Sequence, residues 1–409
     1  MVNKISKQQR EFLDWEFGVF FHFGIRTFYE GHKDWDMQEM DAKAFNPTAL
    51  DCESWIKTIK EAGAKYAILV TKHHDGFALW PSEYTEYSVK NSPWKDGKGD
   101  VVREYVDACR KCGIKVGLYY SPAQFGTREM DGEKYCDYFT GQLSELLLNY
   151  GKIDYLWFDG CGSEGIEYDK VRIVDTIRKI QPEILIFNMW DPDTRWVGNE
   201  RGFVPMPNYN YVEKFNDSLL DEKLDEIGGK LYAPAECDFK MREKNWFYSD
   251  FDEDSRKTLD ELLGIYYMSV GRGANFLINI GPDRRGLLPE ADAKLLLELG
   301  DEVRRRFSRP IQPINITKEG NTITIEFNGD VLCNTVVLKE DLGVENEIDE
   351  FEISANGRDA RCYIHLYKGT TIGHKAICDF PHICTDKLVI KLNRSAEQII
   401  DVKVYNTKK

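Results

Sequence analysis

Up to residue 309, short segments of continuously apolar residues alternate with segments of helical periodicity. The apolar segments have the length of strands and are rich in β-branched and aromatic residues: 17–24, 65–74, 115–122, 154–160, 184–190, 231–236 and 275–282. Helical segments between them include 50–63, 100–113, 142–152 and 255–271. Continuous apolarity indicates strands buried on both faces, and intervening helices make such strands parallel. The pattern predicts an α/β fold with a (β/α)8-like (TIM-type) barrel, and no dinucleotide-binding fingerprint follows the first strand to favour an open sheet.

The pattern changes after residue 309. Short β-rich segments separated by turn residues follow one another at 321–327, 334–340, 351–357, 360–369, 386–392 and 401–406. This spacing is typical of an antiparallel β-sandwich. The sequence therefore predicts a barrel domain at 1–309 and a C-terminal β-sandwich domain at 310–409.

The charge balance excludes some classes of partner. The chain has 54 lysines and arginines against 69 aspartates and glutamates, a formal charge of −15 at pH 7. Such a surface repels phosphate backbones and anionic lipids, so we expect neither nucleic acid nor a membrane as a partner. The first residues lack the apolar core of a signal peptide, which predicts a cytoplasmic protein, or a secreted one if a leader was trimmed. The ten cysteines are scattered, and we expect reduced thiols and no cofactor; the oligomeric state stays open.

Polar residues gather near the C-terminal ends of the predicted strands. His22, His73, His74, Asp159 and Glu236 each end an apolar segment. In a barrel these ends form one rim, where active sites are built. We therefore expect these side chains to share a site.

Asp159 lies in the segment LWFDG at 156–160. With period-2 alternation, Trp157 and Asp159 share one face of the strand, so both are predicted to point into the barrel mouth. The alternative is an aspartate that caps the next helix.

His73 and His74 are adjacent in TKHHDGFALW (71–80). Neighbouring residues on a strand face opposite sides, so we expect that the two histidines do not chelate one metal ion. Metal-dependent barrel hydrolases prefer His-x-His, and neither that motif nor HExxH occurs. We interpret the histidines as hydrogen-bond partners for a polyhydroxylated ligand; a structural role and a metal-dependent barrel hydrolase are the alternatives.

A glycosidase needs two carboxyl groups on opposite sides of the scissile bond. Asp159 is the candidate for the ionised group. Glu200 and Glu236 are the candidates for the protonated group; apolar shielding by Trp196 would raise the pKa of Glu200. The alternative for either glutamate is an ordinary exposed carboxylate.

Tryptophans near these positions suit carbohydrate binding. Their rings stack on the C–H faces of sugars and their N–H groups would hold hydroxyls, although each alone is more often a packing residue. The candidates are Trp35, Trp80, Trp157, Trp196 and Trp246.

These segments resemble the α-L-fucosidases of glycoside hydrolase family 29. The resemblance is carried by FGVFFHFG (17–24), residues 65–89 with KHHDGFALWPS, GIKVGLYYSP (113–122), DYLWFDG (154–160), RWVGNE (195–200), PAECD (234–238), residues 259–286 and, more loosely, 369–380. It covers nearly the whole chain. It implies an exo-acting glycoside hydrolase that releases terminal α-L-fucose from fucosylated oligosaccharides with retention of configuration, and RWVGNE resembles the branch that prefers α-1,3/1,4-linked fucose.

The resemblance also implies roles for single residues. Asp159 corresponds to the nucleophile and Glu200 to the acid/base, with Glu236 as the second candidate. The residues implied to line the fucose pocket are His22, Trp35, His73, His74, Tyr119 and Trp157. Asp34 stands where the family has a glutamate, and Ala235 is inserted in the PAECD motif. A non-catalytic carbohydrate-binding protein and a metal-dependent barrel hydrolase are the alternative functions.

Overall fold

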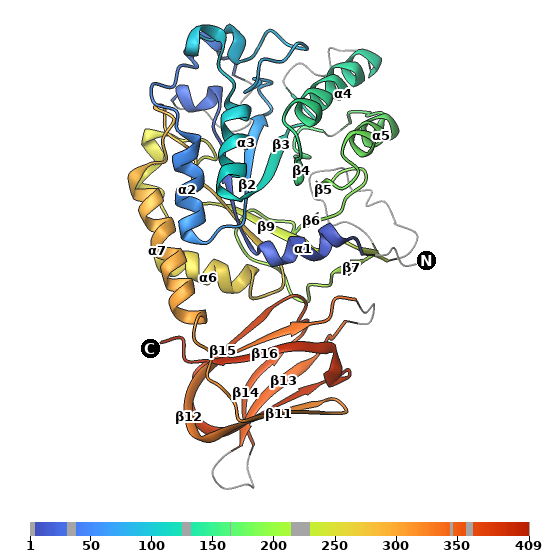
Figure 1. The fold of residues 1–409 in the computed structure, drawn as a ribbon, viewed down its shortest axis with the longest axis vertical. Helices are drawn as coiled ribbons and strands as arrows, with labels where there is room; N and C mark the ends of the chain where they lie inside the picture. Colours follow the sequence, from blue (N-terminus) through green and yellow to red (C-terminus); the bar gives the residue numbers. More distant parts are fainter. Residues whose placement is uncertain are drawn as a thin grey trace.

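The computed structural model describes residues 5–30, 38–124, 132–163, 165–213, 230–343, 347–356 and 363–408. These residues form a helix-covered parallel barrel and, beneath it in Figure 1, an antiparallel sheet built from the C-terminal part of the chain.

The barrel consists of eight parallel strands. They are β1 (Phe17–Phe21), β2 (Tyr66–Lys72), β3 (Lys115–Tyr120), β4 (Tyr155–Phe158), β5 (Leu185–Phe187), β6 (Arg195–Trp196), β9 (Ala235–Lys240) and β10 (Asn275–Asn279). Their order in the sheet is β5-β4-β3-β2-β1-β10-β9-β6. A single parallel bridge between Phe187 and Thr194 joins the two edges, so the barrel is nearly closed. The predicted TIM-type fold is confirmed.

The helices pack around and beneath this barrel. They are α1 (Lys7–Trp15), α2 (Cys52–Ala62), α3 (Val101–Cys112), α4 (Gly132–Asn149), α5 (Lys170–Ile180), α6 (Leu259–Ser269) and α7 (Glu290–Phe307), with short 3-10 helices at Ile25–Phe28, Ala42–Ala44, Val89–Asn91, Trp94–Gly97, Asp250–Ser255 and Ala396–Gln398. Local signals set their ends: the side chain of Asp51 caps α2, and Gly63 ends it in the left-handed conformation that favours glycine. In the part of the chain that the structure describes, no helix is both long and apolar enough to cross a membrane.

The N-terminal end of the barrel is closed by α1. Phe12 and Trp15 of this helix contact Tyr66 and Tyr155, whose side chains fill the barrel interior. The side-chain amide of Asn275 donates to the carbonyl oxygen of Phe12 over 2.8 Å, which fixes the helix to β10. The opposite end, where the strands terminate, is therefore the end that can hold a ligand.

One predicted barrel strand was wrong. Residues 231–236 do not form a barrel strand: β8 (Leu231–Tyr232) pairs antiparallel with β7 (Tyr211–Val212), and the barrel strand β9 begins at Ala235. Glu236 therefore lies near the start of a strand instead of at its end. The apolar pattern missed β9 because its inward face carries two carboxyl groups, of Glu236 and Asp238.

The C-terminal domain is one antiparallel sheet of six strands. They are β11 (Asn315–Glu319), β12 (Thr322–Glu340), β13 (Phe351–Asn356), β14 (Tyr363–Gly369), β15 (Ala376–Leu392) and β16 (Ile399–Tyr405). The register of β12 with β15 shifts twice, and the first half of β12 pairs with β11 while the second half pairs with β16. Both halves contribute to one apolar core, so the sheet folds over itself as a sandwich. The segments predicted as separate strands at 321–327 and 334–340 belong to this single strand. The predicted domain boundary after residue 309 falls between α7 and β11.

Candidate functional site

A cavity opens at the C-terminal end of the barrel. Its empty volume is about 730 Å³, including a mouth open to solvent. Seven of the predicted site residues line it: His22, His73, His74, Tyr119, Trp157, Asp159 and Glu200. Trp35 lies outside the described residues. Glu236 does not line the cavity, so the expectation that its side chain shares this site is wrong.

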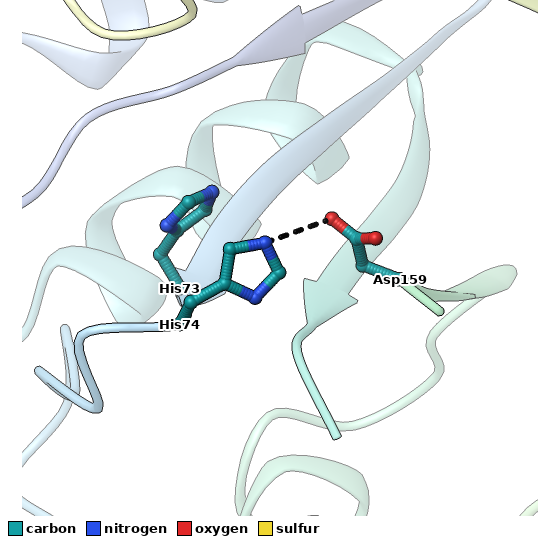
Figure 2. Close-up of side chains that lie close together, drawn as sticks. All are labelled: His73, His74 and Asp159. Atoms are coloured by element: carbon teal, nitrogen blue, oxygen red, sulfur yellow. Dashed lines mark ion pairs between the residues drawn. The ribbon is translucent and has the colours of Figure 1, made fainter. Parts of the chain in front are cut away.

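Asp159 directly follows β4, and its carboxylate accepts two hydrogen bonds. Oδ2 accepts a hydrogen bond from the Tyr119 hydroxyl over 2.7 Å, Oδ1 accepts from the backbone N–H of Cys161 over 2.9 Å, and His74 Nε2 lies 3.4 Å from Oδ2 (Figure 2). Burial raises the pKa of Asp159, while the two hydrogen bonds oppose that rise. Asp159 caps no helix, because the next helix, α5, is capped by Asp169. The functional interpretation is therefore preferred over the helix-cap alternative.

His73 and His74 both line the cavity, which the alternation argument did not predict. β2 ends at Lys72, so the two histidines lie beyond the strand and period-2 alternation no longer separates them. Their ring centroids lie 4.1 Å apart, and one ligand atom each from His73, His74 and Asp159 lie within 4.8 Å of one another. These donors have the chemistry to bind a divalent cation and equally suit the hydroxyl groups of a sugar.

Two of the pocket histidines are neutral imidazoles at pH 7. Burial lowers the pKa of His22 and of His74 to about 3. Asn279 donates its amide N–H to the carbonyl oxygen of Trp246, so its Oδ1 accepts from His22 Nδ1–H over 2.7 Å. His22 therefore carries its proton on Nδ1 and can accept a hydrogen bond at Nε2.

Glu236 lies beneath the cavity floor, fully buried. Its carboxylate accepts hydrogen bonds from the Tyr66 hydroxyl over 2.6 Å, from Trp157 Nε1 over 2.8 Å and from the Tyr155 hydroxyl over 3.3 Å. Burial raises the pKa of Glu236 to about 7, against the effect of these three donors. Because the N–H of Trp157 is used here, the expectation that it binds a sugar hydroxyl is wrong, and the residue presents its ring to the cavity.

Asp238 is a pocket residue that the sequence did not single out. It follows Glu236 by two positions on β9, so the two side chains share a face, and Asp238 lies one pleat nearer the rim. Its Oδ1 accepts the indole N–H of Trp196 over 2.7 Å. Burial, and then the charge of Glu200, raise the pKa of Asp238 well above its usual range. Alternation along AECDFK would have found Asp238 once the start of β9 was known.

Glu200 lies between β6 and β7 and lines the cavity mouth. It is exposed, so the apolar shielding expected from Trp196 is not observed. Backbone contacts tie its neighbours to β9: Val197 N–H donates to the carbonyl of Glu236, and Arg201 bridges Phe239. Among the residues that the structure describes, three carboxyl groups thus line the cavity, of Asp159, Glu200 and Asp238.

The candidate tryptophans divide between the cavity and the barrel core. Trp157, Trp196 and Trp246 line the cavity. Trp80 is buried outside it and donates its N–H to Glu145 on α4 over 2.8 Å, so Trp80 is a packing residue.

The chain is similar to known proteins along nearly its whole length. The family model described as alpha-L-fucosidase matches residues 2–305. Alpha-L-fucosidase 1 of Arabidopsis thaliana is 32% identical, over 98% of this chain and 87% of that protein.

Two solved structures share the fold. A glycoside hydrolase 29 family member from an unknown rumen bacterium is 32% identical with a TM-score of 0.89, covering 99% of this chain and 77% of that one. A Bacteroides thetaiotaomicron protein assigned as an alpha-L-fucosidase is 30% identical with a TM-score of 0.90, covering 98% and 97%. Together with the family match, these similarities show that the chain belongs to the alpha-L-fucosidases of glycoside hydrolase family 29.

Proposed function

We propose that this fucosidase is a retaining exo-enzyme that releases terminal α-L-fucose by double displacement, with Asp159 as nucleophile and Glu200 as acid/base. The observation that carries the proposal is the placement of Asp159: its carboxylate is oriented by Tyr119 and Cys161 in the wall of a cavity that Glu200 also lines. An aspartate fixed by two donors is oriented for attack and remains ionised more readily than an unpaired buried one.

The reaction balances with these two groups alone. An Asp159 oxygen attacks the anomeric carbon as the glycosidic C–O bond breaks, and Glu200 gives its proton to the departing oxygen. Glu200 then takes a proton from water, whose oxygen attacks the same carbon and releases Asp159. Both steps invert the carbon, so the configuration is retained; such pairs have carboxyl groups roughly 5–5.5 Å apart.

Substrate recognition uses groups that the fold holds rigid. The neutral imidazole of His22 accepts a sugar hydroxyl at Nε2, and His73 and His74 lie on the same wall. The rings of Trp157 and Trp246 supply apolar surface for the sugar C–H groups. A pocket with paired polar groups rejects sugars that leave these groups without partners.

The linkage preference that we propose is α-1,3/1,4, within branched fucosylated oligosaccharides. RWVGNE supports it, together with the exposed position of Glu200 at the mouth, where a branched leaving group has room. Release of fucose from a trisaccharide with an α-1,3- or α-1,4-linked fucose, faster than from the α-1,2-linked isomer, is the expected result. Equal rates, or a preference for α-1,2, would contradict this branch.

The stereochemistry is tested by proton NMR of a running digest. α-L-Fucose as the first product signals retention, whereas β-L-fucose would exclude a covalent Asp159 intermediate. Binding without release would favour a carbohydrate-binding protein instead. Loss of activity after EDTA treatment, restored by a divalent cation, would favour a metal-dependent hydrolase that uses His73, His74 and Asp159.

A further inference from the structure

The C-terminal domain contacts the chain segment that carries Glu200. This segment, residues 197–210, runs from β6 to β7 and returns toward the C-terminal sheet, with β7 near the junction of the two domains (Figure 1). Its first part is tied to β9 by the backbone contacts of Val197 and Arg201. Its last part is held by the C-terminal domain.

Glu347 makes the most extensive of these contacts. Its Oε1 accepts from the backbone N–H of Asn210 over 3.0 Å and from the Asn210 side-chain amide over 3.0 Å, and its Oε2 accepts from the backbone N–H of Tyr211 over 3.1 Å. Glu347 is 6% exposed and Asn210 is 1% exposed. Removing a buried carboxylate that accepts several N–H groups costs much more stability than removing one surface hydrogen bond, because the buried N–H groups are left without partners.

A second contact reinforces the first. The backbone N–H of Asn208 donates to Thr371 Oγ1 over 3.0 Å, and the Asn208 side chain donates to the carbonyl of Arg272 over 2.9 Å. Arg272 in turn donates from Nη1 to the carbonyl of Val204 over 2.6 Å. Positions on both sides of the Met206–Pro207 bond are therefore fixed.

Glu347 and Thr371, which contact the segment, lie next to residues that are fixed within the C-terminal domain. Glu340, at the end of β12, accepts from the backbone N–H of Ile348 over 2.7 Å and from that of Gly373 over 3.1 Å. These two bonds fix the neighbours of Glu347 and Thr371. A chain of hydrogen bonds thus connects Glu340 at the end of β12 with the segment that carries Glu200.

We propose that Glu347 is a positioning residue for Glu200: the C-terminal domain holds segment 197–210 so that the acid/base stays within reach of the glycosidic oxygen. This rests on the proposed function, which assigns Glu200 as the acid. Small displacements of a catalytic group cost a large factor in rate, so a relaxed segment slows proton transfer.

The test compares E347Q with E350Q in the full-length chain. Glu350 lies three positions on, is exposed and pairs with Lys368, so it is a matched control that does not contact the segment. Two aryl fucosides are used: a dinitrophenyl fucoside, whose leaving group needs little protonation, and a methoxyphenyl fucoside, whose leaving group needs the acid.

E347Q should lower kcat/KM about 10- to 100-fold for the methoxyphenyl fucoside and less than about threefold for the dinitrophenyl fucoside, while E350Q changes neither. E200Q should show the same leaving-group dependence, and E200Q/E347Q should lose no more than E200Q alone. A purely structural role for Glu347 would slow both substrates equally. That outcome, or wild-type rates in E347Q, would overturn the proposal.

Amide hydrogen exchange separates this proposal from the acid assignment. E347Q should speed exchange in residues 197–210, whereas unchanged exchange there overturns the positioning role. If E200Q shows no leaving-group dependence, the assignment of Glu200 fails, whatever exchange shows. Should E347Q not fold, T371V removes the hydrogen bond from Asn208 and the 4.0 Å contact with Met206 Sδ, both of which are made to the same segment. We expect this variant to show a weaker form of the same leaving-group and exchange pattern, and the absence of that pattern counts against the proposal.

Discussion

Trp157 donates its indole N–H to Glu236 Oε1 over 2.8 Å, so a wall of the candidate sugar pocket is held by a carboxylate that does not line the cavity. The Trp157 ring stacks on Phe187 at a centroid distance of 4.2 Å. Glu236 thus fixes the tilt of an aromatic surface from below.

The stability of the wild type should depend on pH more strongly than the stability of E236Q. Burial raises the pKa of Glu236 from 4.5 to about 7, so the folded protein keeps this proton where the unfolded chain loses it. The free energy of unfolding of the wild type should therefore fall, relative to E236Q, by about 3 kcal/mol as pH rises from 4.5 to 7, and level off above pH 7. Urea unfolding of both proteins across this range measures it. Parallel stability profiles would show that folding does not raise the pKa of Glu236.

D159A should abolish turnover without loss of the fold. Removal of the nucleophile costs at least about 10³-fold in kcat, because no other group forms the covalent intermediate. Aryl-fucoside hydrolysis measures the loss, and thermal unfolding checks the fold. Near-wild-type activity in D159A would refute the nucleophile assignment.

Y119F should shift the acidic limb of the pH–rate profile to higher pH. The Tyr119 hydroxyl donates to Asp159 Oδ2 and lowers the pKa of that carboxyl group, which burial raises. Without this donor the pKa of Asp159 rises further, and activity that requires the carboxylate is lost at higher pH as the solution is acidified. We expect kcat/KM at neutral pH to fall about tenfold, with the profile as the decisive readout. An unmoved acidic limb would mean that Tyr119 does not control this ionisation.

Azide should restore activity to E200A but not to E236A. The small anion can enter the cavity mouth in the space left by Glu200 and attack the fucosyl–enzyme, whereas the Glu236 carboxylate lies beneath the floor. Formation of fucosyl azide is measured by mass spectrometry. The same assay on D238A is the matched control, since Asp238 lines the same cavity. Rescue confined to D238A or E236A would move the acid/base role to that residue.

Cys161 should make the enzyme sensitive to thiol reagents. It lines the cavity two residues after Asp159 and is partly exposed, whereas the exposed Cys384 lies on β15 of the C-terminal domain, away from the site. Alkylation of Cys161 places a bulky group beside the nucleophile, so iodoacetamide should inactivate the wild type, fucose should protect it, and C161S should resist. Inactivation of C161S but not of C384S would assign the effect to Cys384.

Much of the barrel could be read from local pattern. Helix α2 has its cap at Asp51 and its terminating glycine at Gly63, both visible in the sequence. Trp157 and Asp159 were placed on one inward face by alternation alone, and both line the cavity. These features depend on residues near in sequence.

Other features of the site and of the C-terminal sheet could not be predicted from local pattern. The end of β2 at Lys72 brings His73 and His74 to the same cavity, although alternation would have separated them. The two short strands predicted at 321–327 and 334–340 are one long strand, because both halves of β12 find partners in the same folded sheet.

The sequence by itself determined the strand and helix periodicities, the inward face of β4 and the residue types at the rim. Only the tertiary structure decided which acid reaches the cavity: β9 pairs with β10 so that Glu236 lies beside Asn275 and Asp238 beside Leu277, one pleat higher. A side chain's depth in a barrel is set by strand register, and register is fixed by hydrogen bonds to neighbouring strands that are remote in sequence. Local periodicity therefore gives the direction of a side chain but not its height.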